Sequence, residues 1–155
     1  MDDREELTAL HPNHVKVLRI AATLTALPFV IGSLVLEVAD LLPRGAFAVP
    51  VLLVAGFLIV RVPLRRHAAR GYAMGEDRLR VVRGILFRSD TVVPFGRVQH
   101  IDVDQGPLER AYGLATLTLH TAGNHNASVA LPGLAEEDAR AMRETIRARI
   151  RRDTM

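Results

Sequence analysis

Cysteine and tryptophan are both missing from this 155-residue chain, and aromatic residues make up only 5% of it. The absence of cysteine excludes disulfides and thiolate metal sites, and it leaves the redox compartment open. Tyr72 and Tyr112 are the only tyrosines. Because proteins that bind single-stranded nucleic acid stack the bases on aromatic side chains, we predict no nucleic-acid partner.

Charge is missing from two stretches of the chain and abundant elsewhere. The sequence has 20 basic and 17 acidic residues, yet residues 20–36 and 46–60 contain none of them. The length allows one ordinary domain, or a smaller domain plus another element. A modest excess of arginine beside apolar segments favours anionic lipid head groups over nucleic acid as the surface that these side chains face.

The two uncharged stretches predict a transmembrane helical hairpin over residues 17–64. The first stretch reaches about 25 Å at about 1.5 Å per residue, and Val17, Leu18 and a snorkelling Arg19 extend it to a full span. Pro28 is expected to kink this helix. The second stretch is shorter and needs Arg61 to snorkel. A short polar turn joins the two: Glu37, Asp40, Pro43, Arg44 and Gly45.

Basic residues beside the two spans predict the orientation of the hairpin. They are frequent at its outer ends, whereas the joining turn contains only Arg44. By the positive-inside rule, residues 1–16 and residues 65–155 are then both cytoplasmic. A buried helix pair in a soluble protein is disfavoured by the length of the two runs. A cleaved signal peptide is disfavoured because the leading segment is long and acidic.

From Gly71 onward, the apolar pattern changes from a helical period to a period of two. The runs RLRVVRG, VQHIDVD, LATLTLHT and ASVALP predict short antiparallel strands with one wet face. In the second run, Gln99, Ile101 and Val103 are expected on the inner face. A helix over about residues 135–151 closes the chain, and its apolar stripe consists of Ala139, Met142, Ile146 and Ile150.

The predicted fold class is therefore an α+β membrane protein. A two-helix transmembrane hairpin comes first, and an antiparallel β sheet or split barrel follows it, capped by a C-terminal amphipathic helix.

One candidate site lies on the predicted strand VQHIDVD. His100, Asp102 and Asp104 share its outer face, and His120 faces outward on a later strand. Two imidazoles and two carboxylates are ligands that zinc accepts, so a metal-dependent hydrolase is one hypothesis. The period of two places polar residues on a half-exposed strand in any case. We therefore predict no metal, no cofactor and no catalytic residue.

The run HPNH also places two histidines, His11 and His14, three residues apart. Because the residue before a proline favours an extended or turn conformation, we interpret this run as a juxtamembrane turn.

Arginines form the second candidate site. Those near the hairpin and the first strands could face lipid head groups, although a solvated basic face beside an anionic leaflet is the favoured interpretation. The candidate lipid-facing residues are Arg61, Arg65, Arg66, Arg70, Arg78, Arg80, Arg83 and Arg88.

The run from MGEDRLRVVRG to LATLTLHTAG, followed by VALPGLAEEDARAMRETI, resembles the bacterial pleckstrin-homology-like (PH-like) domain of the YdbS type. The family pattern includes QGPLxRxxGLATLxLHTAG and LPGL, and the LHP at residues 10–12 also fits it. The resemblance covers residues 71 to about 149. It implies a PH-like split barrel closed by a helix, in a small bacterial inner-membrane protein with two spans before the domain. It implies no catalytic residues.

The resemblance also implies a partner, because some family members work beside a longer membrane protein with further PH-like domains. Together, these observations predict a membrane-anchored, non-enzymatic PH-like interaction module at the cytoplasmic face that binds a partner membrane protein. A lipid head-group-sensing accessory protein is the alternative, and the metal-dependent hydrolase is the third hypothesis. The identity of the partner and the homo-oligomeric state stay open.

Overall fold

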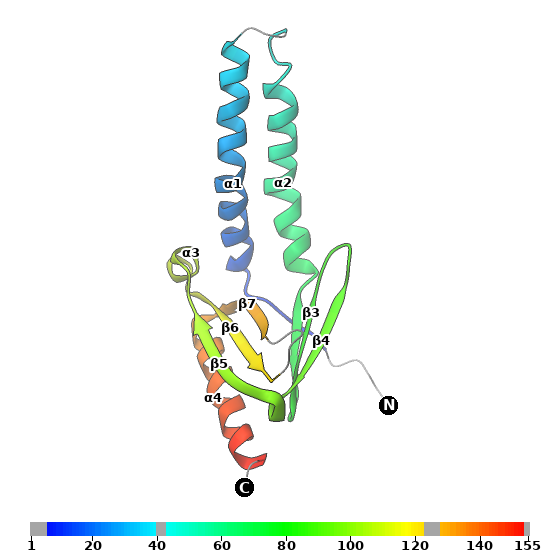
Figure 1. The fold of residues 1–155 in the computed structure, drawn as a ribbon, viewed down its shortest axis with the longest axis vertical. Coiled ribbons are helices and arrows are strands. Elements are labelled where there is room, and N and C mark those ends of the chain that lie inside the picture. Colours follow the sequence, from blue (N-terminus) through cyan, green and yellow to red (C-terminus); the bar gives the residue numbers. More distant parts are fainter. Residues whose placement is uncertain (1–5, 40–42, 123–127, 154–155) are drawn as a thin grey trace. The chain divides into compact units, whose positions relative to one another are not determined.

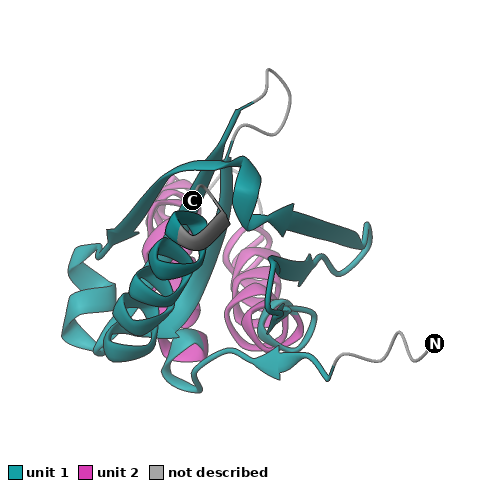
Figure 2. Cartoon of the chain, turned by 90° about the horizontal axis from the view of Figure 1, so that it is seen from below, with its two compact units in different colours: residues 1–14, 66–155 teal, residues 15–65 magenta. Residues whose placement is uncertain are grey.

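The computed structural model describes residues 6–39, 43–122 and 128–153. Contacts divide the chain into two compact units (Figure 2). The hairpin unit comprises residues 15–65, and the β unit comprises the residues before 15 and after 65. The hairpin unit is thus inserted, in chain order, into the β unit.

Two long helices, α1 (Asn13–Val38) and α2 (Ala48–Ala68), account for most of the hairpin unit (Figure 1). Both are long and apolar enough to cross a membrane. Their large apolar side chains are mostly exposed, as for Phe29 at 68% and Leu53 at 70%. Because the core helix of a soluble protein buries such side chains, this surface suits lipid and agrees with the predicted pair of spans.

Hydroxyl groups within α1 are satisfied by the helix itself. The hydroxyls of Thr23 and Thr25 donate to the carbonyl oxygens of Arg19 and Ala21, one turn earlier, at 2.9 and 2.8 Å. No water is present in a bilayer core to accept these donors, so the bonds allow threonine within a span.

Glu37 caps the start of α2. We expected it in the polar turn, but it lies in the last turn of α1. Its carboxylate accepts the backbone N–H groups of Gly45, Phe47 and Ala48, the last two at 3.3 and 3.2 Å. These N–H groups have no partner within α2, and the helix dipole favours an anion beside them. The side chain of Glu37 thus links the end of α1 to the start of α2. Asp40 of the expected turn lies outside the described residues.

The first sheet of the β unit has four antiparallel strands in chain order: β1 (Thr8–Ala9), β2 (Gly71–Met74), β3 (Arg78–Arg83) and β4 (Ser89–Pro94). The sequence did not predict β1, because two residues are too few to show an alternating pattern. It pairs Thr8 with Tyr72 and Ala9 with Gly71, across the inserted hairpin unit.

The second sheet follows a short 3₁₀ turn, η1 (Phe95–Arg97). It contains β5 (Val98–Asp104), β6 (Leu114–Thr121) and β7 (Ser128–Ala135), with the short helix α3 (Pro107–Ala111) between β5 and β6. β4 and β5 follow each other in the chain but do not pair, so the barrel is split. α4 (Glu136–Asp153) contacts all three strands of this sheet and η1 (Figure 1). The predicted fold class is confirmed.

The core lies among the inner faces of the two sheets and α4. Leu79, Leu117, Leu119 and Leu131 point inward as the alternation predicts, and none is more than 2% exposed. The predicted stripe of α4 is buried at Ala139, Met142 and Ile146, and Ile150 packs against the same core.

The prediction for Gln99 was wrong. Gln99 is exposed, and its neighbour Val98 is buried instead. The pairing of β5 with β6 shifts register between Val98 and His100, as a β-bulge does. Since a bulge adds one residue to one strand, it reverses the alternation before it and leaves Ile101 and Val103 turned inward.

Two phenylalanines provide a matched test of this core. Phe95 is 0% exposed and Phe87 is 90% exposed. We predict that Phe95→Ala lowers the free energy of unfolding by about 3–5 kcal/mol, because it leaves a cavity. Phe87→Ala should change it by less than about 0.5 kcal/mol. Chemical denaturation of the full chain in detergent, followed by circular dichroism, measures both, and equal losses would contradict the placement of Phe95.

Candidate functional site

The eight candidate arginines are divided between the two units, and those of the β unit have different surroundings. Arg78 donates to Asp77, with Nε 2.8 Å from Oδ1, and Arg80 donates to Asp90, with Nη2 2.6 Å from Oδ2. The hydrogen bonds from these arginines lower the pKa of each carboxyl group below its ordinary value. Two of the predicted lipid-facing charges are therefore offset by acids, Asp77 in the turn before β3 and Asp90 on β4.

Three other arginines come together. Arg66, Arg70 and Arg83 line an open groove of 590 Å³ together with the connection between β3 and β4. Burial, together with the positive charges of Arg66 and Arg83, lowers the pKa of the Arg70 guanidinium. Arg70 thus lies near two other positive charges in this groove. Such a cluster favours an anion.

Three candidates remain, Arg88 in the β unit and Arg61 and Arg65 in the hairpin unit. Arg88 lines a second groove, of 440 Å³, that shares Arg70, Gly84 and Ile85 with the first. Arg61 and Arg65 belong to the hairpin unit and are exposed on α2.

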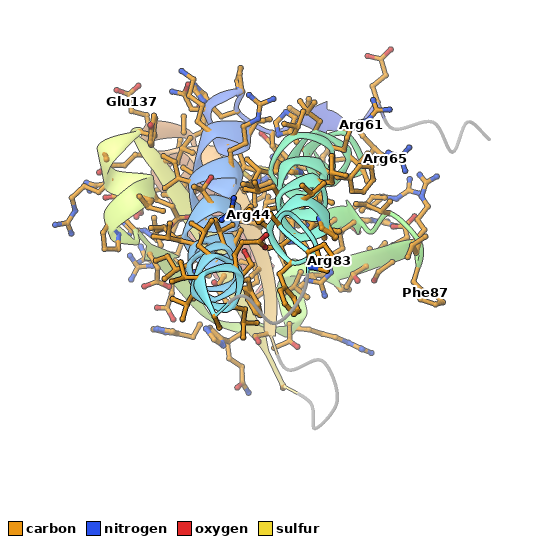
Figure 3. All side chains as sticks on the ribbon, turned by 90° about the horizontal axis from the view of Figure 1, so that it is seen from above. Arg44, Arg61, Arg65, Arg83, Phe87 and Glu137 are labelled. Carbon is orange, nitrogen blue, oxygen red and sulfur yellow. The ribbon has the colours of Figure 1, made fainter. Side chains whose placement is uncertain are left out.

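The connection between β3 and β4, residues 84–88, is here called the β3–β4 tip. Gly84 has a φ of +113°, and a Cβ built on it would lie 1.8 Å from the carbonyl oxygen of Phe87, so the backbone fold requires glycine. Leu86 and Phe87 are 89% and 90% exposed. Figure 3 shows Phe87 at the end of this hairpin with its side chain directed away from the ribbon.

Sequence reasoning missed this feature, because residues 85–88 lie outside the alternating runs that predict the strands. The signal was present in the triplet ILF, since three consecutive apolar residues are unusual in a connection where polar residues are expected.

The outer face of β5 and β6 brings three predicted residues together. The Nε2 atoms of His100 and His120 lie 2.7 and 3.1 Å from the two carboxylate oxygens of Asp102. The two rings are 6.0 Å apart, and all three side chains are at least 40% exposed. The carboxylate therefore bridges two imidazoles on a wet surface.

Asp104 does not join this group. It pairs with Thr116, whereas Asp102 pairs with Thr118, two residues further along β6. Among the described residues, no set of three or more histidine, aspartate and glutamate side chains is arranged to hold a metal ion. The four residues of the hydrolase hypothesis are thus not gathered around one point.

A second histidine pair joins the buried His14, in the run where the sequence predicted only a turn, to the half-buried His67 of α2. His14 is 4% exposed, its Nε2 lies 3.2 Å from Nη1 of Arg70, and its ring is 6.0 Å from that of His67. Since arginine can only donate, Nε2 accepts and Nδ1 carries the proton. The Nδ1 atoms of both histidines are buried with no hydrogen-bond partner among the described residues.

Gly133 makes room for this pair. A Cβ built on it would lie 2.6 Å from Cγ of His14, and its φ is +77°. Its carbonyl oxygen accepts the N–H of His11 at 2.8 Å. The run HPNH and the run LPGL, far apart in sequence, therefore pack directly on each other.

The connection between β5 and β6 also has a structural role. The Glu109 carboxylate accepts the N–H of Gly106 at 2.8 Å and the hydroxyl of Thr116 at 2.7 Å. The Gln105 amide donates to the carbonyl of Leu114 at 2.7 Å. These bonds hold α3 against β6 and engage the side chains of Gln105, Glu109 and Thr116 within the connection.

Comparison with known proteins gives two matches. The family model for the bacterial PH domain matches residues 15–150, which include both the hairpin unit and most of the β unit. The transmembrane protein YdbS of Bacillus subtilis (strain 168) is 35% identical over 85 residues, covering 55% of this chain and 52% of that protein. The chain thus spans about half the length of this curated relative. No solved structure matches.

Gly133 and Gly113 allow a test of the contact with His14. Both have positive φ, at +77° and +66°, but a Cβ on Gly113 would meet nothing within 4 Å. We predict that Gly113→Ala costs about 1–2 kcal/mol of stability, from backbone strain alone. Gly133→Ala should cost more because of the clash with His14.

The clash can be isolated with a double variant. Adding His14→Ala to Gly133→Ala should recover part of the loss, a coupling that thermal unfolding of the full chain in detergent would detect. If Gly113→Ala and Gly133→Ala lower the stability equally, His14 does not lie against Gly133.

The pair of Arg80 and Asp90 predicts a dependence on pH. Because the folded pKa of Asp90 lies below its ordinary value of 3.8, the pair stabilises the fold above that value, and the effect is lost as pH falls through the folded pKa. Asp90→Asn should therefore be less stable than the natural chain at pH 7, and the difference should vanish in strongly acidic solution. A difference that does not change with pH would exclude the ion pair as its cause.

Proposed function

The chain belongs to the bacterial PH domain family, and we propose that it is a membrane-anchored, non-enzymatic interaction module that binds a partner membrane protein. The relative from Bacillus subtilis is named a transmembrane protein, and α1 and α2 can supply the anchor. In this proposal the hairpin unit crosses the bacterial cell membrane twice. Both termini are cytoplasmic, as the basic residues beside the spans indicate.

The unpaired edge of β5 is the observation that carries this proposal. β5 has seven residues and ends the second sheet, where it pairs with β6 on one side only in the described part of the chain. The opposite edge of this sheet is already engaged, because Gly133 on β7 accepts the N–H of His11. An open strand edge recognises an extended segment of another protein through backbone hydrogen bonds.

The side chains of β5 offer specificity for such a segment. Gln99, His100 and Asp104 are exposed along the strand, and the carboxylate oxygens of Asp102 lie within 3.1 Å of the Nε2 atoms of His100 and His120. An added strand would meet these side chains at alternate positions. The bulge at Val98 and His100 limits the length of regular edge, which guards against indiscriminate pairing with other sheets.

The membrane anchor supports a partner in the same membrane. Because the hairpin unit already confines the β unit to the membrane surface, a weak edge contact is sufficient to hold a partner that shares that membrane. Recruitment to the membrane itself requires no further ligand.

Site-specific photocrosslinking in native membranes tests the proposal. A photoreactive residue at Gln99 or Asp104 should yield an adduct with another membrane protein. The control is the same residue at Glu144, whose side chain is 59% exposed on α4. Adducts at β5 but not at Glu144 are expected. Equal adducts at all three positions, or none at β5, would contradict the proposed edge, and an adduct of two copies would indicate a homo-oligomer instead.

A further inference from the structure

We propose that the β3–β4 tip is a membrane-interface site. Leu86 and Phe87 enter the surface of the anionic bilayer that anchors the chain, and the groove of Arg66, Arg70 and Arg83 binds phospholipid phosphates there. This lipid contact goes beyond the proposed binding of a partner protein and uses a different part of the β unit.

The exposure of the tip is unusual within the β unit. Leu86 and Phe87 are 89% and 90% exposed, whereas the next most exposed large apolar side chain of the described β unit, Val92, is at 47%. Covering two adjacent, fully hydrated apolar side chains with an apolar phase lowers the free energy of the system. A bilayer interface provides such a phase without a partner protein.

The backbone presents these side chains in a defined way. β3 and β4 pair along their whole length, up to Arg83 with Ser89, and the tip closes directly on that last pair. Gly84 lets the carbonyl of Phe87 fold back onto the turn. Because the tip is already ordered, insertion loses little conformational entropy.

The charges around the tip suit a phosphate-rich surface. Arg66, Arg70 and Arg83 share the groove that contains Ile85, Leu86 and Phe87, and Arg88 lines the neighbouring groove. None of Arg66, Arg83 and Arg88 forms an ion pair with a described residue. Guanidinium groups bind phosphate through paired hydrogen bonds. Arginines beside an apolar tip are the combination that binds an anionic interface, since a free phosphate ion would make no use of Leu86 and Phe87.

The strand register places the tip at the end of the first sheet where the chain arrives from α2. Ala9 pairs with Gly71, Gly71 with Val82, and Val82 with Asp90. The tip therefore lies at the sheet end where β2 begins. Only residues 69–70 lie between the end of α2 and β2, and they span at most about 7 Å when fully extended. Chain connectivity alone thus keeps the tip within reach of the bilayer surface.

Fluorescence of a single tryptophan tests this proposal, because the natural chain has none. The Phe87→Trp variant of the full chain is placed, one copy per nanodisc, in phosphatidylcholine with phosphatidylglycerol. The emission should shift to shorter wavelength relative to the same variant in phosphatidylcholine alone, and lipids brominated on their acyl chains should quench most of it. Val92→Trp, on the same hairpin but away from the tip, is the matched control and should show neither effect.

Charge reversal tests the arginine groove. Arg66→Glu with Arg83→Glu should remove most of the shift and the quenching in the Phe87→Trp background. Arg143→Glu with Arg147→Glu on α4 changes the net charge equally and should leave both intact. Emission of Phe87→Trp that stays typical of water, with no quenching by brominated lipid, overturns the proposal. A shift of the emission to shorter wavelength that appears only in native membranes also overturns the proposal, in favour of a protein partner. A shift on addition of inorganic phosphate, without quenching by brominated lipid, overturns the membrane contact and leaves a site for phosphate alone.

Discussion

The pairing of β1 with β2 is the constraint on which the rest of the structure depends. Only two residue pairs are involved, Thr8 with Tyr72 and Ala9 with Gly71, yet they join segments that the entire hairpin unit separates in sequence. The chain must therefore leave the first sheet and return to it at the same end. Leu10, directly after β1, is 3% exposed in the core, and His11 then bonds to Gly133 in the second sheet. The segment before the hairpin unit thus belongs to the same fold as the residues after it, and the first sheet is complete only when the chain has returned to pair β2 with β1.

The residues that carry the family resemblance each have a structural role in the β unit. Leu114 and Ala115 of the GLAT run are fully buried, Gly113 before them has positive φ, and Glu109 holds the connection to β6. The LHP and LPGL runs meet through the bond from His11 to Gly133. These motifs describe how the two sheets and the start of α1 fit together. They therefore indicate the fold with considerable specificity and contain little information about a ligand or partner.

The sequence was sufficient for the features that depend on local periodicity. Alternation predicted the inward positions of Leu117 and Leu119, and the helical stripe predicted Ala139 and Ile146. The bulge at β5 was not predictable, because the pairing of β5 with β6 decides which residue is added. The cluster of His14, His67 and Arg70 joins residues up to 56 positions apart and exists only in the folded chain. The sequence also could not distinguish arginines that pair with an acid from those that do not. The partner of Arg80, for example, is ten residues away across a turn.

We propose that a membrane hairpin, inserted in chain order within a PH-like domain, fixes that domain at the cytoplasmic face. Because the natural chain has no cysteine, single cysteines report its topology without interference. Arg44 lies in the turn between α1 and α2, and Glu76 lies in the turn between β2 and β3, both exposed. A membrane-impermeant maleimide applied from outside should label Arg44→Cys in intact spheroplasts and Glu76→Cys only after permeabilisation. Labelling of Glu76→Cys in intact spheroplasts, or protection of Arg44→Cys in them, would contradict the account.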